Sequence, residues 1–429
     1  MDQTDGNDNT TASEEDKLIV EKKLYRQKIV IACFCSLSFF AGTTRAIQVP
    51  IIIPESLKLD VPLNQAQWIL LAFHASSLPT LLLQPSLNKW GNGKFAVTIG
   101  LIGWLALGIF YICPMMGKWY LYVAVIARLV GGTCYYLICN KIIVGMVRIF
   151  QGNASHSSVT WDVSVSAGTT LGSYLGPFFV NLISFSDTML LCACLILAVS
   201  ITLGIVFPSQ NASTEEQERA EYKKSLKMHF MPYLIGYGWG PQICIGACMI
   251  FVDGNLTYFY MQDYDKSYTF GGVMLGISSI VYSLTSFIIG YIGSKTPSIL
   301  PRVIEVGLLN AGIQLIFLGP VFSINHTADI WISVISFNLL LISSSAVQYA
   351  TLTYTAKKVS ELMTPEEAMS IAINVWYMAF NIGACIGPLI AGALIKDLGF
   401  RTVFVIGSPF LFVFAALPYF IKIATSPAR

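Results

Sequence analysis

The sequence predicts an all-α membrane protein whose twelve transmembrane helices form two six-helix bundles. Three observations lead to this prediction: a low content of charge, a succession of apolar segments, and a motif that occurs once in each half. Of the 429 residues, 55% are apolar and only 12% are Asp, Glu, Lys or Arg, whereas a soluble domain carries roughly 25% charged residues. The composition therefore excludes a large soluble enzyme, and the formal net charge of +2 gives no reason to expect a nucleic acid partner.

Apolar segments of membrane-spanning length begin after Lys28 and continue almost to the C-terminus. A transmembrane helix needs roughly 20 mainly apolar residues. We expect twelve such helices, at 28–50, 67–87, 94–115, 120–142, 162–184, 187–208, 236–261, 270–292, 302–322, 330–353, 369–394 and 401–423. The lipid bilayer is therefore the main surrounding of the chain, which we expect to be a monomer.

Polar stretches divide the chain into domains. Residues 1–26 are expected to form a disordered cytosolic tail, since they lack the basic start and cleavage site of a secretory signal. Residues 27–208 would form the N-terminal bundle and residues 232–423 the C-terminal bundle, followed by a cytosolic tail at 424–429. The break at 209–231 places acidic residues before basic ones, an order that suits a helix dipole. We expect it to be a linker helix on the cytosolic membrane surface.

Lysine and arginine are distributed unequally across the predicted membrane. With the N-terminus in the cytosol, 19 of them fall on the cytosolic side and five on the opposite side, while Arg45 and Arg128 lie within helices. Because cytosolic loops are enriched in Lys and Arg, we expect a multi-pass protein with both termini in the cytosol. The charge pattern does not distinguish a vesicle or other endomembrane from the plasma membrane.

A glycine motif occurs twice, 211 positions apart, in apolar segments of the two halves. Small residues four apart let helices approach closely, and a following proline bends the helix. We therefore expect a conformational hinge in each half. The residues concerned are Gly172, Gly176 and Pro177, and Gly383, Gly387 and Pro388.

A second repeat lies in the connections after the second and the eighth predicted helix, at an offset of 206 residues. Parallel repeats of this kind are typical of transporters built from two related bundles around a central cavity. We expect these connections to act as gating loops. Their residues are Asn88, Lys89 and Gly91 in the first half, and Gly290, Ser294 and Lys295 in the second.

These motifs resemble those of the major facilitator superfamily. The two Gly-x-x-x-Gly-Pro runs are similar to its motif in helices five and eleven, which is associated with exchangers, and Arg128-x-x-x-Gly132 is similar to its fourth-helix motif. The loop after the second helix is similar to the gating motif but departs from it, because Gln84 replaces a glycine and Asn88 an aspartate. The charge-dependent latch of that motif is therefore in doubt in this chain.

Within residues 250–400 the chain resembles the vesicular amine transporters more closely, and particularly their polyamine branch. The resemblance rests on Phe251 to Leu256, Phe317 to Val321, Asn381 to Pro388, and Gly399-Phe400. It implies proton-coupled exchange of an organic amine into an acidic vesicle, with a proton gradient as the driving force and no cofactor.

Charged side chains within the apolar segments are the candidates for coupling protons to substrate, because buried charge is costly and usually faces a cavity or a partner. The resemblance gives Arg128 a relay or gating role, the alternative being a structural ion pair. Asp253 matches an acidic position of the amine transporters and could exchange a proton for a cationic amine, or could be solvated near its helix end. Asp162 could instead cap a helix, and His74 could be a packed, hydrogen-bonded residue.

Aromatic rings could hold an amine by cation–π attraction. The candidates for the substrate cavity are Tyr135, Tyr136, Tyr258, Tyr349, Trp376, Tyr377 and Phe380, although many of these rings could face lipid or neighbouring helices instead. Arg45 is a further candidate that points the other way, because an arginine in the cavity would favour an organic anion.

The sequence thus predicts a secondary transporter that works by alternating access, with protons and a small organic cation, a polyamine or monoamine, as its ligands. An organic anion or neutral metabolite carrier of the same fold is the first alternative. A non-transporting receptor or scaffold is the second. No metal-ligand cluster, activated nucleophile or phosphate-binding glycine loop is found, so the sequence gives no indication of an enzyme.

Overall fold

The computed structural model describes residues 14–80, 90–150, 154–207, 235–319, 326–362 and 365–425, and the regular secondary structure among these residues is helical. The N-terminal half contains α1 (Glu14–Lys58), α2 (Leu63–Ala75), α4 (Asn92–Ile112), η1 (Cys113–Trp119), α5 (Tyr120–Ile149), α6 (Ala154–Leu182) and α7 (Phe185–Val206). The C-terminal half contains η2 (Ile235–Trp239), α10 (Gly240–Tyr264), α11 (Tyr268–Lys295), η3 (Pro297–Ile299), α12 (Leu300–Leu318), α13 (His326–Ser360) and α14 (Pro365–Thr425).

Within these residues, eight helical stretches are long and apolar enough to cross a membrane. The two longest, Asn92–Ile143 with 52 residues and Ile371–Ala416 with 46, are each at least twice the roughly 20 residues that one crossing needs. Each also contains a glycine with a positive φ, 54° at Gly117 and 73° at Gly399, where the chain turns out of the helical conformation. The protein is a multi-pass membrane protein, and the count of twelve spans stays a prediction.

The helix limits differ from the expected ones mainly at the N-terminus. α1 begins at Glu14, so the last 13 residues of the segment expected to be a disordered tail, residues 14–26, are helical. Glutamate, lysine and leucine are good helix formers, so a polar segment can extend a membrane helix without any hydropathy signal. The predicted linker at 209–231 and the predicted second-helix residues 81–87 lie outside the described residues.

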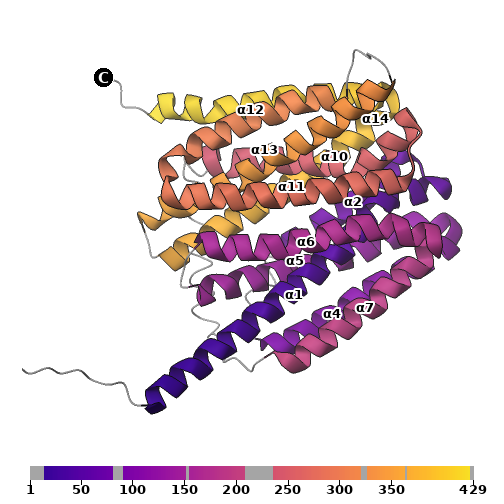
Figure 1. Ribbon diagram of the computed structural model, residues 1–429. Helices are drawn as coiled ribbons and strands as arrows, with labels where there is room; N and C mark the ends of the chain where they lie inside the picture. The colour runs from indigo at the N-terminus through magenta and orange to yellow at the C-terminus, as the bar shows by residue number, and fades with distance from the viewer. Residues whose placement is uncertain are drawn as a thin grey trace, which may run out of the picture.

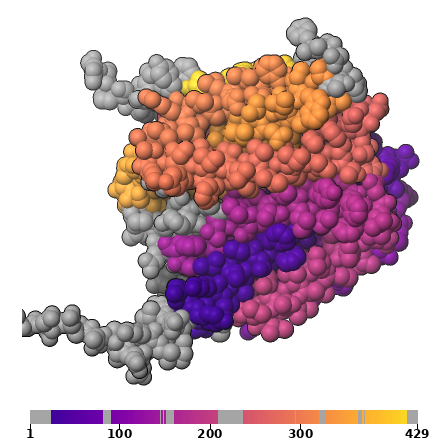
Figure 2. Space-filling view, in the orientation of Figure 1, coloured from indigo at the N-terminus to yellow at the C-terminus, as the bar shows by residue number. Residues whose placement is uncertain are grey.

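The helices form two bundles that lie side by side. In Figure 1 the helices of the first half, from α1 to α7, occupy the lower part and α10 to α14 the upper part, with their axes running broadly in the same direction. The space-filling view in Figure 2 shows the same division of the surface between the two halves. We call the end where α7 finishes at Val206 and η2 begins at Ile235 the linker end, and the opposite end, with the connection from α1 to α2, the far end.

Large apolar side chains on the outer helices face outwards. Ile205 on α7 is 80% exposed and Val413 on α14 is 65% exposed, and Leu182 and Leu284 are exposed to a similar degree. A soluble monomer rarely exposes so much contiguous apolar surface. Exposure of apolar side chains to water is unfavourable, whereas their contact with lipid is not. The exposed residues therefore agree with the membrane assignment.

The two glycine motifs pack helices within each bundle. A Cβ atom at Gly172 or Gly176 would overlap the carbonyl oxygen of Thr43 or Ile47 on α1, and one at Gly383 or Gly387 would overlap that of Ile243 or Ala247 on α10. The α1–α6 and α10–α14 pairs are therefore equivalent contacts in the two halves. The motifs do not lie at the interface between the bundles, where a joint between the halves would be expected, and their hinge role stays a prediction.

This packing leads to a first prediction. Gly383→Ala should lower the thermal unfolding midpoint of the purified protein, since the new methyl group forces α14 away from α10 at a cost of about 1–3 kcal/mol. Gly108→Ala on α4 is the matched control, because no atom lies within 4 Å of its added Cβ and alanine favours helix by about 1 kcal/mol. Equal midpoints for the two variants would contradict the packing.

Candidate functional site

A cavity of about 140 Å³ lies between the two bundles. Its lining comes from α1, α5 and α6 on one side and from α10, α11, α13 and α14 on the other. Neither half alone could form it, because each half contributes one wall. This is the position in which the repeat predicted a central cavity.

Three charged residues line this cavity: Arg45 on α1, Asp162 on α6 and Asp253 on α10. The Asp162 carboxylate is buried and accepts a hydrogen bond of 2.6 Å from the Ser286 hydroxyl on α11, which belongs to the other bundle. Among the described residues, no group lies within hydrogen-bonding distance of the buried Oδ1 atom of Asp253. Asp253 therefore has an open acceptor position in the cavity.

Aromatic rings form a second part of the lining. Trp376 and Phe380 on α14 are stacked, with centroids 6.1 Å apart and an interplanar angle of 14°. Trp161 on α6 meets Trp376 edge to face at 6.1 Å, and Tyr136 on α5 meets Tyr377 at 6.1 Å. Rings from both bundles thus contact each other next to the carboxylates.

Arg45 lies over the ring of Tyr135 with its guanidinium carbon 5.5 Å from the centroid. Of the residues predicted from the sequence for the cavity, it lines this cavity together with Tyr135, Tyr136, Trp376, Tyr377 and Phe380. Of the four coupling candidates, Asp162 and Asp253 also line it.

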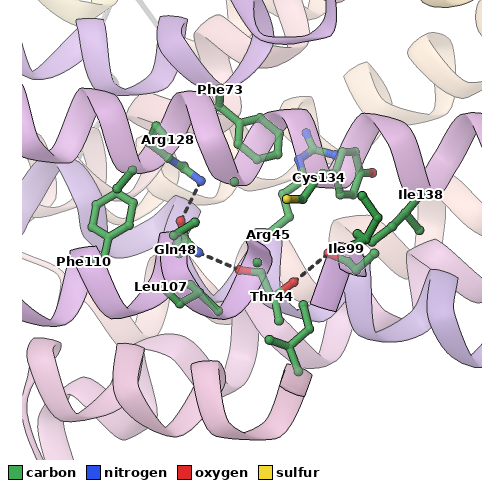
Figure 3. Close-up of a pocket in the computed structure, with 17 residues that line it drawn as sticks. Thr44, Arg45, Gln48, Phe73, Ile99, Leu107, Phe110, Arg128, Cys134 and Ile138 are labelled. Carbon is green, nitrogen blue, oxygen red and sulfur yellow. Dashed lines mark hydrogen bonds between the residues drawn. The ribbon is translucent and has the colours of Figure 1, made fainter. Parts of the chain in front are cut away.

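The other two coupling candidates lie elsewhere. Arg128 lines a separate pocket within the N-terminal bundle, where its Nη1 donates to Gln48 Oε1 at 2.7 Å (Figure 3). His74 on α2 is buried, with its Nδ1 atom 2.6 Å from the hydroxyl of Tyr136 on α5 and 3.5 Å from Asn381 Oδ1 on α14. Neither side chain lines the central cavity.

Two predicted cavity tyrosines are also absent from the lining of this cavity. Tyr258 packs against Phe400 near the far end, with centroids 5.5 Å apart. Tyr349 is buried beside a much smaller space, of about 10 Å³, near Trp161 and Trp376. Sequence spacing within one helix did not reveal which face each ring would occupy.

The predicted gating residues are described only in part. Asn88 and Lys89 lie outside the described residues, Gly91 precedes α4 as its N-cap, and Gly290, Ser294 and Lys295 form the last part of α11 at the linker end. Lys295 donates to the Tyr291 hydroxyl one turn earlier.

Sequence reasoning missed several polar or aromatic residues of the cavity, among them Trp161, Tyr282 and Gln348. The Tyr282 hydroxyl donates to Gln348 Oε1 at 3.0 Å, which joins α11 to α13. A glutamine in the middle of an apolar helix is a signal that could have been used, since membrane interiors disfavour unpaired polar groups.

The bundles touch each other on both sides of the cavity. Towards the far end, Gln67 Nε2 on α2 donates to Asn255 Oδ1 on α10 at 2.6 Å. Towards the linker end, Trp161 packs in one apolar cluster with Leu352 and Met369 of the second half. The two bundles are therefore in contact on both sides of the cavity.

Comparison with known proteins shows the family. The family model of the Major Facilitator Superfamily matches residues 34–363 and 355–429, so the chain belongs to this superfamily. Its fold and family make it a membrane transporter rather than an enzyme, and the sequence resemblance to this superfamily is confirmed.

Two curated relatives are similar over part of their length. The MFS-type transporter SLC18B1 of Mus musculus is 21% identical over 265 residues, which cover 60% of this chain and 55% of the relative. The Homo sapiens protein of the same name is 19% identical over 263 residues, with the same coverage. The chain thus spans about half the length of the curated relatives that it matches.

Solved structures are similar over almost the whole chain. A bacterial homolog to the human lysosomal transporter Spinster, in an inward-facing and unoccupied conformation, matches with a TM-score of 0.70 and 14% identity, covering 94% of this chain and 99% of that one. A POT family transporter in complex with a thioalcohol-conjugated peptide matches with a TM-score of 0.64 and 15% identity, covering 95% and 97%. At these identities the likeness shows the fold alone.

The contact of His74 with Tyr136 generates a second prediction. His74→Phe and Tyr136→Phe should each lower the thermal unfolding midpoint, because each leaves one buried polar group without its partner, at a cost of about 1–3 kcal/mol. The double variant should lose little more than either single variant, since the same bond is removed only once. Strictly additive losses in this double-mutant cycle would mean that the two groups do not interact.

Proposed function

We propose that this protein is a proton-coupled antiporter of small organic cations that works by alternating access. The observation that carries the proposal is the charge of the central cavity, whose lining holds two carboxylates, Asp162 and Asp253, against one cation, Arg45. With all three groups ionised, the cavity has an excess of one negative charge. One added positive charge, either a proton or an amine, would neutralise this site.

Asp253 is the group best suited to exchange these two cations. Its Oδ1 atom lacks a hydrogen-bond partner among the described residues, whereas Asp162 already accepts a bond from Ser286. A buried carboxylate oxygen without a hydrogen-bond partner costs free energy, which either protonation or an ammonium group relieves. Competition between proton and amine for Asp253 would couple the two fluxes in opposite directions.

The rings beside Asp253 support a cationic substrate. Trp376, Tyr377 and Phe380 line the same cavity, and a cation over an aromatic face gains about 0.5–2 kcal/mol, with the larger values in desolvated sites. The sequence resemblance to the vesicular amine transporters supports the same choice. Polyamines and monoamines both have the required ammonium groups.

An anion carrier is less consistent with the arrangement of the arginines. That alternative requires Arg45 and Arg128 to face the cavity together, but Arg128 lines the separate pocket in the N-terminal bundle. The remaining arginine is outnumbered by carboxylates. An organic anion would add a further negative charge to this site.

The transport cycle would consist of opening one set of contacts between bundles while the other stays closed. The eight long apolar stretches would make ten membrane crossings if Asn92–Ile143 and Ile371–Ala416 each cross twice. Crossings by α2 and α6 would bring the number to twelve. The excess of Lys and Arg supports a cytosolic linker end and, with it, cytosolic termini. The far-end contact of Gln67 with Asn255 would then close the cavity towards the lumen or the exterior.

The role of Asp253 is tested by uptake into proteoliposomes with an acidic interior, using spermidine, serotonin and an organic anion in parallel. The unmodified protein should accumulate one of the two amines. Asp253→Asn should lose at least about tenfold in rate, because a neutral amide neither takes up a proton nor neutralises an ammonium group. Asp397→Asn is the matched control. Asp397 is exposed and lies near the turn at Gly399 in the middle of α14, at the far end of the molecule.

Three results would overturn the proposal. Undiminished uptake by Asp253→Asn removes this residue from coupling, uptake of the anion alone supports the anion carrier, and no uptake of any solute by folded protein supports a receptor or scaffold.

Alternating access is tested by a disulfide across the bundles. A Cβ atom at Gly392 on α14 would lie 3.4 Å from the Gln67 Cβ on α2, close to the spacing of about 3.8 Å in disulfides. Oxidation of the double variant Gln67→Cys with Gly392→Cys should stop uptake, and a reductant should restore it.

The matched control for this disulfide is Val97→Cys with Gly204→Cys, whose Cβ atoms would lie 3.7 Å apart on α4 and α7 of one bundle. Its oxidation should leave uptake unchanged, because the bundles can still move relative to each other. Normal turnover by the oxidised pair across the bundles would rule out movement at this contact.

A further inference from the structure

Beside the central cavity, the N-terminal bundle contains a second pocket of about 50 Å³ (Figure 3). It lies among α1, α2, α4, α5 and α7, and no residue of the C-terminal half lines it. Its lining contains two arginines, Arg45 and Arg128, and no carboxylate among the described residues. The pocket is therefore a positively charged space inside one bundle.

Arg128 is held at one wall of this pocket. The side chain is 3% exposed, and its Nη1 atom donates to Gln48 Oε1 at 2.7 Å. Gln48 is fixed in turn, since its Nε2 atom donates to the Thr44 carbonyl oxygen at 3.1 Å. Figure 3 shows this chain of bonds running from Arg128 through Gln48 to Thr44. The Arg128 Nε atom is buried and has no hydrogen-bond partner among the described residues.

Arg45 brings a second positive charge to the same place. The guanidinium carbons of Arg45 and Arg128 lie 6.0 and 4.9 Å from the centroid of one ring, that of Phe73. Two like charges that share one ring repel each other, and the repulsion is strong where apolar side chains exclude water. The Phe73 ring and the Gln48 amide oxygen do not neutralise the Arg128 charge. The carboxylates that face Arg45 lie in the central cavity and not in this pocket.

Water alone does not fit the pocket well. A buried water molecule is stable when it makes about three hydrogen bonds, but it does not neutralise the charge of either arginine. Gln48 Oε1 accepts from Arg128, and the Thr44 hydroxyl donates to the carbonyl oxygens of Phe40 and Ala41. An anion needs donors only, and it also neutralises charge.

We propose that this pocket binds one small monovalent inorganic anion of the size of chloride, between the Arg128 Nε atom and the Arg45 guanidinium. The volume favours a small anion over a bulky organic one, and the apolar remainder of the lining, which includes Leu107, Phe110 and Ile138, disfavours a strongly hydrated divalent anion. Arg45 lines both spaces. An anion bound in this pocket therefore attracts the Arg45 guanidinium and weakens its interaction with the carboxylates of the central cavity. The site does not depend on which solute is transported.

The test measures binding without a membrane gradient, so that its result is independent of the transport assay. Purified protein in gluconate buffer is titrated with radiolabelled chloride by equilibrium dialysis at constant ionic strength. We expect saturable binding of about one chloride per chain. The thermal unfolding midpoint should rise with chloride concentration, because a ligand that binds only the folded state stabilises it.

Variants then locate the site. Arg128→Gln should weaken chloride binding at least tenfold, while Arg302→Gln, which removes an exposed cation from α12, should leave it unchanged. Ala106→Leu fills the pocket and keeps both arginines, so it should also abolish binding. It provides the decisive variant if Arg128→Gln does not fold.

Absence of saturable chloride binding to the unmodified protein overturns the proposal and means that water fills the pocket. Binding that survives both Arg128→Gln and Ala106→Leu places the anion elsewhere and overturns it as well.

Discussion

The cost of charge inside a membrane protein is the constraint on which this structure depends. A charged side chain in an apolar bundle must have an opposite charge, dipoles or water beside it. Here four charged residues, Arg45, Arg128, Asp162 and Asp253, lie at two neighbouring cavities and not in the packed apolar clusters. Arg45 belongs to both cavities, so the electrostatics of the two spaces are linked through one side chain.

Close helix packing creates the walls that hold these charges. The glycines of α6 face α1, and those of α14 face α10, so that each pair of helices forms a rigid half of the molecule. Since the tight contacts are within bundles, the looser polar and aromatic contacts between bundles are the ones that can exchange. The pair of Gln67 with Asn255 and the meeting of Trp161 with Trp376 are contacts of this second kind.

The fold could be predicted from the sequence to a large extent because its signals are local. Length and apolarity of a segment indicate a membrane helix, and the repeated glycine runs indicate two related halves. Hydropathy did not predict the polar start of α1 (Glu14–Lys58). Residues that favour a helix but are not apolar do not raise the hydropathy of a segment. The glycine runs indicated close helix packing, but their spacing did not show which helix each run packs against.

The sequence by itself determined that this is a membrane protein with two similar halves, and it singled out the few charges buried in its helices. Only the tertiary structure decided which of those charges face the same space. Arg45 and Arg128 belong to different helices, and a rotation of either helix by half a turn would change the cavity that its side chain lines. Packing between helices determines that rotation, so Asp253 lines the central cavity while Arg128 lines the pocket within the N-terminal bundle.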